Sequence, residues 1–237
     1  MRSVFVFVFL VAISCKKSDT PSTNQEADLS FTESFDDDAL AKANGWSFVN
    51  KSMAEGTSSW RNPENTPFSP FKTTSVTNGY LWTDYNSTST SGGTISNWAI
   101  SPIIKFHNGD EISFYTRAQI FFYNDDSSDY INRLQFRINL NNTGDNVGAG
   151  SETGDFNQVL LDINPDYREF LFDAFTSGDP QVRLAYPHRW TKFTVTIKDL
   201  PSSTEGRFAF RYFLENGGPG GRGSSVGIDE VSYKQSR

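Results

Sequence analysis

The sequence predicts an all-β fold, a two-sheet jelly-roll sandwich built as a single domain. The chain of 237 residues contains 21 Phe, 9 Tyr and 5 Trp, side chains that favour pleated strands over helices. Apolar and polar residues alternate with period two along many short segments, which is typical of strands with one buried face. Gly, Pro, Asn and Asp separate these segments, as expected for the turns of a sandwich.

The alternating or apolar runs predict the strands one by one. A short helix is predicted over residues 37–44, where early aspartates suit the positive end of the helix dipole and Gly45 can end it. The glycine-rich stretch 217–223 is interpreted as a flexible hairpin loop. The predicted strands cover residues 31–35, 79–83, 98–104, 111–118, 133–140, 159–163, 190–197, 207–214 and 226–233.

The first residues have the pattern of an export signal. Arg2 precedes ten apolar residues, 4–13, too few for the roughly 20 that a membrane-spanning helix needs. Val11-Ala12-Ile13-Ser14-Cys15 resembles a bacterial lipobox, and Cys15 is the chain's only cysteine. We therefore expect a signal peptide over 1–14, a lipidated Cys15 with a flexible tether over 15–29, and one jelly-roll domain over 30–237.

Composition excludes several classes of protein. The formal charge is −7, from 21 Lys and Arg against 28 Asp and Glu, so no nucleic-acid partner is expected. Two histidines and one cysteine are too few for zinc sites of the usual kind, iron–sulfur clusters or a disulfide framework. Contact with a membrane is expected only through the lipid.

An ordered series of short motifs resembles the cleaved-adhesin and choice-of-anchor J domains of bacterial proteins. The resemblance covers residues 31–235 and implies a jelly-roll sandwich with an adhesive or carbohydrate-binding role, often with structural calcium. It also favours an outer-membrane lipoprotein, facing the cell surface or the periplasm. The motifs include Glu33-Ser34-Phe35-Asp36, Gly45-Trp46, Asn97-Trp98-Ala99-Ile100-Ser101-Pro102, Gly109-Asp110-Glu111-Ile112-Ser113-Phe114, Gly206-Arg207-Phe208-Ala209-Phe210-Arg211-Tyr212 and Gly227-Ile228-Asp229-Glu230-Val231.

Calcium is the expected cofactor, with a structural role. In jelly rolls of this type the first and last strands lie side by side, which would bring Glu33 and Asp36 near Asp229. Pooled carboxylates repel each other unless a cation neutralises them, and Ca²⁺ prefers oxygen ligands. The alternative is that these acids sit on solvated strand edges. Asp125, Asp126 and Asp129 form a second acidic loop, interpreted either as a calcium loop or as a solvated turn.

The expected partner is a glycan or a surface protein. Sugar recognition on sandwich domains uses aromatic rings that stack on the apolar faces of sugars. Five aromatic residues lie in or beside polar loop sequence and are candidates for such contacts, although aromatics are more often buried. They are Trp60, Trp82, Tyr85, Phe122 and Tyr123, whereas Trp46, Trp98 and Trp190 are expected in the core.

Enzymatic interpretations find little support. No Gly-x-Ser-x-Gly motif accompanies His107 or His188. The alternative that remains is a polysaccharide hydrolase using paired carboxylates such as Glu111 or Asp229. A third alternative is a subunit that contributes only an interface to a larger outer-membrane complex.

Overall fold

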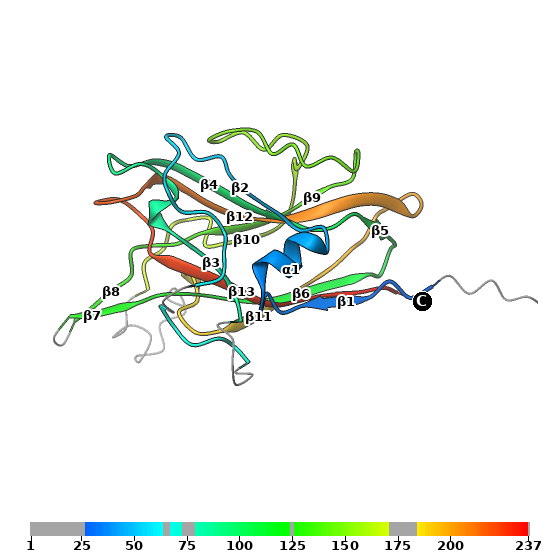
Figure 1. The fold of residues 1–237 in the computed structure, drawn as a ribbon, viewed down its shortest axis with the longest axis horizontal. Helices are drawn as coiled ribbons and strands as arrows, with labels where there is room; N and C mark the ends of the chain where they lie inside the picture. The colour runs from blue at the N-terminus through cyan, green and yellow to red at the C-terminus, as the bar shows by residue number, and fades with distance from the viewer. Residues whose placement is uncertain (1–26, 64–66, 73–78, 124–125, 171–183, 237) are drawn as a thin grey trace, which may run out of the picture.

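The computed structural model describes residues 27–63, 67–72, 79–123, 126–170 and 184–236, with backbone only for residues 122–123 and 126–128. Two antiparallel sheets lie face to face, one below and one above in Figure 1. This arrangement is the predicted β-sandwich. Within these ranges the structure contains no helix long and apolar enough to cross a membrane.

The lower sheet, sheet A, contains the first and the last strands. Its order is β1 (Phe31–Glu33), β13 (Ser225–Lys234), β6 (Glu111–Ala118) and β11 (Thr191–Thr196), while β3 (Leu81–Asp84) pairs with the first half of β13. Phe31 lies opposite Tyr233, so the predicted neighbourhood of the two ends of the chain is confirmed.

The upper sheet, sheet B, is centred on the long strand β12 (Thr204–Gly217). Its order is β10 (Gln158–Ile163), β9 (Leu134–Asn139), β12, β4 (Gly93–Ile100) and β2 (Ser47–Asn50), and β5 (Ile104–Phe106) pairs with the start of β12. A two-stranded ribbon of β7 (Phe121–Tyr123) and β8 (Asp126–Ser128) lies at one end of the molecule.

Two short helical segments complete the fold. Helix α1 (Asp38–Ala43) confirms the predicted helix, and the carboxylate of Asp37 caps it by accepting hydrogen bonds from the backbone of Ala39 and Leu40. The 3₁₀ turn η1 (Tyr85–Ser87) follows β3 directly.

The core fills the space between the sheets with aromatic rings from alternate strand positions. Phe114 of sheet A meets Phe210 of sheet B at a centroid distance of 4.7 Å, and Phe210 stacks on Phe136 at 5.0 Å. Each fully buried ring contributes roughly 1.5–3 kcal/mol of transfer free energy. The phenylalanine-rich composition therefore supplies the cohesion of the sandwich.

Two predicted elements were wrong in detail. The predicted strand 98–104 is two strands, because β4 ends at Ile100 and β5 begins at Ile104, and Pro102 between them has no N–H to donate to a ladder. The stretch 217–223 is not a hairpin loop. It connects β12 in sheet B to β13 in sheet A, so it crosses the end of the sandwich.

The outer face of sheet B is covered by the segment 141–157, which lies above β4 and β12 in Figure 1. Trp98 and Ala209 of the sheet pack there with Val147 and Phe156 of the segment, all buried. Arg211 donates to the carbonyl oxygens of Gly150 (2.6 Å) and Glu152 (3.1 Å), and Arg137 donates to that of Phe156 (2.6 Å). This face of the sheet is therefore part of the protein interior.

Candidate functional site

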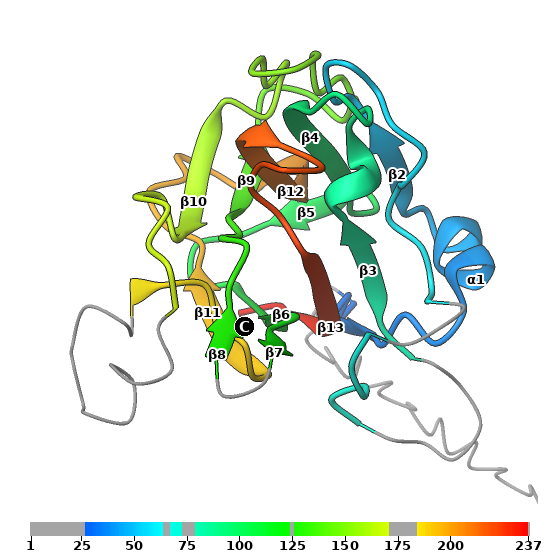
Figure 2. The ribbon, with the colours of Figure 1, turned by 90° about the vertical axis from the view of Figure 1, so that its left-hand side faces the viewer.

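A pocket lined by aromatic rings and glycines opens at the end of the sandwich seen in Figure 2. We call it the loop-end pocket. Its volume is about 280 Å³. Three rings, those of Tyr85, Phe121 and Tyr130, face the connection between β12 and β13. The remaining lining residues are Gly218, Pro219, Gly220, Gly221, Gly223 and Ser224.

Each ring of the loop-end pocket is positioned by local structure. Tyr85 begins η1, and its backbone N–H donates to the carbonyl of Ser224 at 3.0 Å. Phe121 belongs to β7, and its ring meets that of Tyr130 edge to face at 5.5 Å. Gly223 has φ +112°, and a Cβ there would lie 2.8 Å from the Tyr212 hydroxyl oxygen. Only glycine lets the β12–β13 connection pass so close to Tyr212 and Tyr85.

A buried amide holds the polar edge of the pocket. The Asn132 carbonyl oxygen accepts from the Tyr212 hydroxyl (2.8 Å) and from the Ser224 backbone N–H (3.1 Å), while its amide donates to Ser224 Oγ (2.9 Å). Ser224 is thereby fixed in one orientation. The Ser224 hydroxyl also donates to the Gln119 carbonyl at 3.1 Å, so the polar groups of Ser224 are engaged with the protein. The pocket thus combines aromatic faces with a backbone wall, an arrangement suited to a ligand with apolar faces and polar edges.

A second and larger hollow lies at the open edge between the two sheets. We call it the edge pocket, and its volume is about 570 Å³. Its walls are the end of β10, the turn 164–168, Phe170, the segment 184–189 and the start of β11. Figure 2 shows β10 and β11 together at this edge, beside the end that carries the loop-end pocket. The wall includes the rings of Tyr186, His188 and Phe193.

The charged side chains of the edge pocket differ in their partners. Asp162 accepts two hydrogen bonds from Arg133, at 2.9 and 2.6 Å, and this pairing raises the pKa of Arg133. Arg168 pairs with Asp166 at 3.4 Å. Burial, together with the charges of Arg189 and Arg117, lowers the pKa of His188 to about 4, so its imidazole is neutral at pH 7.

Asp129 links the two pockets. Its carboxylate accepts from the backbone N–H of Ile131, next to Tyr130 of the loop-end pocket, at 3.1 Å. It also accepts from the N–H of Phe170, in the wall of the edge pocket, at 2.7 Å. Burial raises the pKa of Asp129 to about 6. One buried carboxyl therefore positions residues on both sides.

Of the five predicted aromatic contact residues, the structure brings Tyr85 into a pocket. Trp60 is wrong as a contact residue: it is 2% exposed and its Nε1 donates to the carbonyl of Asn97 at 3.0 Å in the core. Trp82 is half-buried on β3 with the Arg61 guanidinium 4.4 Å from its ring, and it lines neither pocket. Phe122 and Tyr123 lie in β7, but their side chains are outside the described residues.

Sequence reasoning missed Phe121 and Tyr130. The aromatic run 121–123 and Tyr130 were visible beside the acidic stretch, but the local pattern does not tell which ring faces inward. The twist of a short ribbon and the path of the β12–β13 connection decide this, and neither has a signal in the local sequence.

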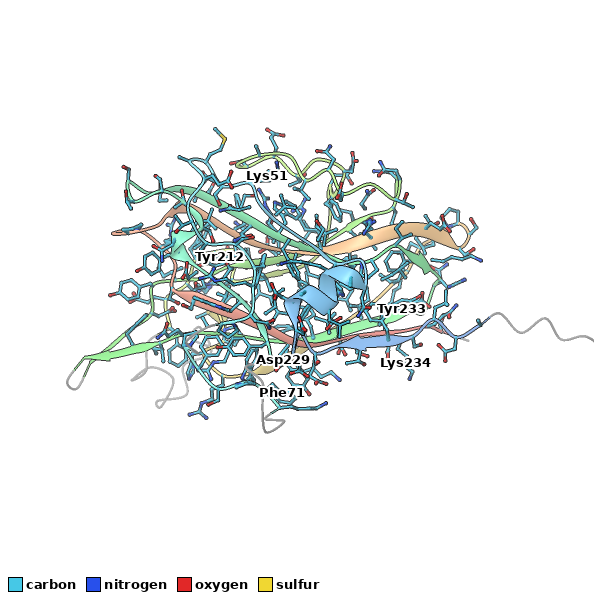
Figure 3. The ribbon with its side chains drawn as sticks, viewed as in Figure 1. Lys51, Phe71, Tyr212, Asp229, Tyr233 and Lys234 are labelled. Carbon is cyan, nitrogen blue, oxygen red and sulfur yellow. The ribbon has the colours of Figure 1, made fainter. Side chains whose placement is uncertain are left out.

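Of the predicted calcium ligands, Asp36 lies close enough to both Glu33 and Asp229 for its charge to raise their pKa values. Asp229, after which the ladder of β13 is interrupted, accepts from the backbone of Phe71 (3.0 Å) and Glu230 (2.7 Å); Figure 3 shows it beside Phe71. Burial raises the pKa of Asp229 to about 7, with smaller contributions from Glu230 and Asp36. Burial also raises the pKa of Glu33, and Asp36 adds to this.

These acids have suitable oxygens for calcium, but they are engaged with the protein. Glu33 accepts from the N–H of Phe35, and Asp36 accepts from the hydroxyl of Ser34. Among the residues that the structure describes, no group of three or more His, Cys, Asp or Glu is close enough to hold a metal ion. Calcium at Glu33, Asp36 and Asp229 stays a prediction.

The other acidic candidates are separated. Asp125 lies outside the described residues, the side chain of Asp126 is not described, and both oxygens of Asp129 accept backbone N–H groups. Asp229 lies opposite Tyr115, four residues along β6 from Glu111. At about 3.4 Å per residue this is about 14 Å, beyond the roughly 9.5 Å of a glycosidase pair. Glu111 and Asp229 are therefore not such a pair.

Solved structures with a similar fold are bacterial adhesin domains. The K1 cleaved adhesin domain of Lys-gingipain from Porphyromonas gingivalis has a TM-score of 0.50 and 19% sequence identity, with 88% of this chain and 99% of that chain covered. The K3 domain of the same protein has a TM-score of 0.50 and 15% identity, with coverage of 89% and 100%. The likeness shows that this chain has the adhesin-like sandwich fold.

A more distant likeness is the CBM22-1 xylan-binding domain of Xyn10C from Paenibacillus barcinonensis. Its TM-score is 0.42 and its identity 11%, with 87% of this chain and 95% of that chain covered. No protein-family model matches the sequence. No curated protein matches it either.

Proposed function

We propose that this protein is a non-catalytic module that binds a glycan through the loop-end pocket. One observation carries the proposal: Tyr85, Phe121 and Tyr130 converge on one pocket whose other wall is the glycine-rich backbone of the β12–β13 connection. Aromatic faces stack on the C–H faces of sugar rings, and exposed amides and hydroxyls bind sugar hydroxyls. Support also comes from the fold, which is shared with domains named as adhesins.

The proposal includes anchoring by lipid on Cys15, which places the domain on the outer membrane. In Figure 1, β1 and the C-terminus lie at one end of the sandwich, and η1, β7 and the β12–β13 connection lie at the other. A tether that enters at β1 would therefore direct the loop-end pocket away from the membrane. This orientation suits a binding module on the cell surface.

The test is binding of a panel of neutral and acidic oligosaccharides to the full-length protein, followed by titration calorimetry of the best ligand. Tyr85→Ala is expected to weaken binding about tenfold, which corresponds to about 1.4 kcal/mol for a lost ring contact. Tyr85→Phe keeps the ring and is the matched control, expected to bind within about twofold of wild type. Equal binding by wild type and Tyr85→Ala, or no glycan bound at all, would contradict the proposal.

We also propose structural calcium at Glu33, Asp36 and Asp229. The raised pKa values of Glu33 and Asp229 support this, because a cation would offset the cost of keeping these two partly or fully buried carboxylates charged in the field of Asp36. A thermal melt with calcium is expected to lie several degrees above one with chelator, since a ligand at 100 times its Kd adds about 2.7 kcal/mol. Identical melting temperatures with calcium and with chelator would contradict the proposed calcium site.

A further inference from the structure

Among the described residues that line the edge pocket, Arg189 is a cationic side chain without a counterion. Asp162 is paired with Arg133, and Arg168 with Asp166. The imidazole of His188 is neutral at pH 7 because burial and two arginines lower its pKa to about 4. Within the described ranges, the guanidinium of Arg189 has neither an ion pair nor a hydrogen bond, although this chain carries a formal charge of −7.

A second arginine reinforces the positive charge at this place. Arg117 of β6 lies close enough to Arg189 that the charge of Arg189 contributes to lowering its pKa, after the larger effect of burial. The Arg117 guanidinium lies 4.4 Å from the ring of Phe68, and its Nε contacts a backbone carbonyl at 3.5 Å. No carboxylate of the described residues pairs with it either.

Apart from the paired charges, Asn164 and Thr191, the edge pocket is lined mainly by apolar and aromatic side chains, and several of them are held by contacts within the protein. The ring of His188 packs on that of Phe170 at 3.9 Å, and the hydroxyl of Tyr186 bonds to Thr116 Oγ1 at 2.6 Å. The pocket volume of about 570 Å³ is within the range of small-molecule sites, roughly 300–1,000 Å³. An apolar hollow with an unpaired guanidinium in its wall suits a compact body that carries an anionic group.

We propose that the edge pocket binds an acidic sugar residue, with Arg189 pairing with its carboxylate or sulfate group. The inference rests on the proposed function in one respect, that the ligand is a glycan. Asp129 holds Phe170 of this pocket and Ile131 beside the loop-end pocket. The two pockets thus act as neighbouring subsites. The loop-end pocket contacts the faces of sugar rings, and the edge pocket binds an anionic group on a sugar.

The first experiment uses His188 as a reporter, since the chain has only two histidines. The full-length protein is titrated with galacturonate, galactose 6-sulfate or neutral galactose, and the ring resonances of both histidines are followed by NMR. Galacturonate or the sulfate is expected to shift His188 and leave His107 unmoved, and the stronger of the two identifies the anion. Equal effects of galactose and both acids, or no shift of His188 with any of them, would overturn the proposal.

The second experiment separates the two pockets by mutation. Arg189→Gln is expected to weaken binding of an acidic oligosaccharide about tenfold, the loss of a charge-assisted hydrogen bond, and to leave a neutral oligosaccharide unaffected. Lys51→Gln removes one exposed positive charge and is the matched control. Lys51 (Figure 3) follows β2, which lies at the edge of sheet B opposite to β10 of the edge pocket. An unchanged affinity of Arg189→Gln, or an equal loss in Lys51→Gln, would overturn the acidic subsite.

The two proposals fail in different ways. If Tyr85→Ala loses affinity for both oligosaccharides while Arg189→Gln binds like wild type, the proposed function stands and the acidic subsite is wrong. If galacturonate shifts His188 while Tyr85→Ala binds every oligosaccharide like wild type, the acidic subsite stands and the loop-end pocket is wrong.

Discussion

The outer face of sheet B and the edge pocket both contain arginines, but they use them differently. On the outer face, Arg211 is buried and its guanidinium donates to Ser96 Oγ, Gln135 Oε1 and two backbone carbonyls of the segment 141–157. In the edge pocket, Arg189 is exposed and its guanidinium has no partner within the described residues. An arginine side chain stabilises the fold in the first region, and another arginine lines a pocket in the second.

Whether the donors of a guanidinium have protein acceptors distinguishes an arginine that stabilises the fold from one that is available to a ligand. A buried guanidinium needs its donors satisfied, because each unsatisfied group costs about 1–3 kcal/mol. The donors of Arg211 and Arg137 are satisfied by backbone carbonyls of the segment 141–157, and these hydrogen bonds hold the segment on the outer face of sheet B. Arg189 remains hydrated at low cost and keeps its donors available. Three predictions sharpen this comparison.

The greatest loss of stability is expected from a substitution on the outer face of sheet B. Arg211→Met should lower the free energy of unfolding by about 3 kcal/mol, since it leaves the carbonyls of Gly150 and Glu152 without their buried donor. Urea denaturation measures the change. Arg222→Met serves as the control, since Arg222 is half-buried and its guanidinium donates to one backbone carbonyl, that of Glu215. A loss below about 1 kcal/mol in Arg211→Met would mean that the hydrogen bonds of Arg211 contribute little to holding the segment 141–157.

An intermediate effect is expected where Asp129 supports the edge pocket. The pKa of Asp129 is raised to about 6 by burial, so the folded state binds this proton more tightly than the unfolded state. The unfolding free energy of wild type relative to Asp129→Asn should therefore rise by about 2 kcal/mol as the pH falls from 7.5 to 4. Denaturation at several pH values measures it, with exposed Asp199→Asn as control. A difference independent of pH would show that Asp129 does not titrate in this range.

The smallest expected effect on stability is at Arg189. Arg189→Gln should change the free energy of unfolding by less than about 0.5 kcal/mol, because Arg189 is exposed and its guanidinium has no hydrogen bond or ion pair with the described residues. The same urea denaturation as for Arg211→Met measures it, so the two arginines are compared directly. A loss above about 1 kcal/mol would show that Arg189 has a structural role, and the contrast between the two regions would disappear.

Much of the fold could be predicted from local pattern. The alternation in 111–118 corresponds to β6 residue for residue, and the acidic start and Gly45 end of the short helix were also right. Where Pro102 interrupts the ladder, the apolar run continues, so periodicity alone joined β4 and β5. The site was less accessible, because Tyr85, Phe121 and Tyr130 come from three separate segments.

The sandwich could be derived from the sequence alone, because periodicity and composition predict it. The pairing of the first and last strands followed from the resemblance to the adhesin domains, and the export signal with a lipidated Cys15 stays a prediction. Only the tertiary structure decided which aromatic rings are buried, as for Trp60, and which converge, as for Tyr85 with Tyr130. The tertiary structure also showed that Arg211 is buried with protein acceptors, whereas Arg189 is exposed in the wall of the edge pocket. Burial and partners are properties of segments distant in sequence, and they arise only when both sheets and their connections are in place.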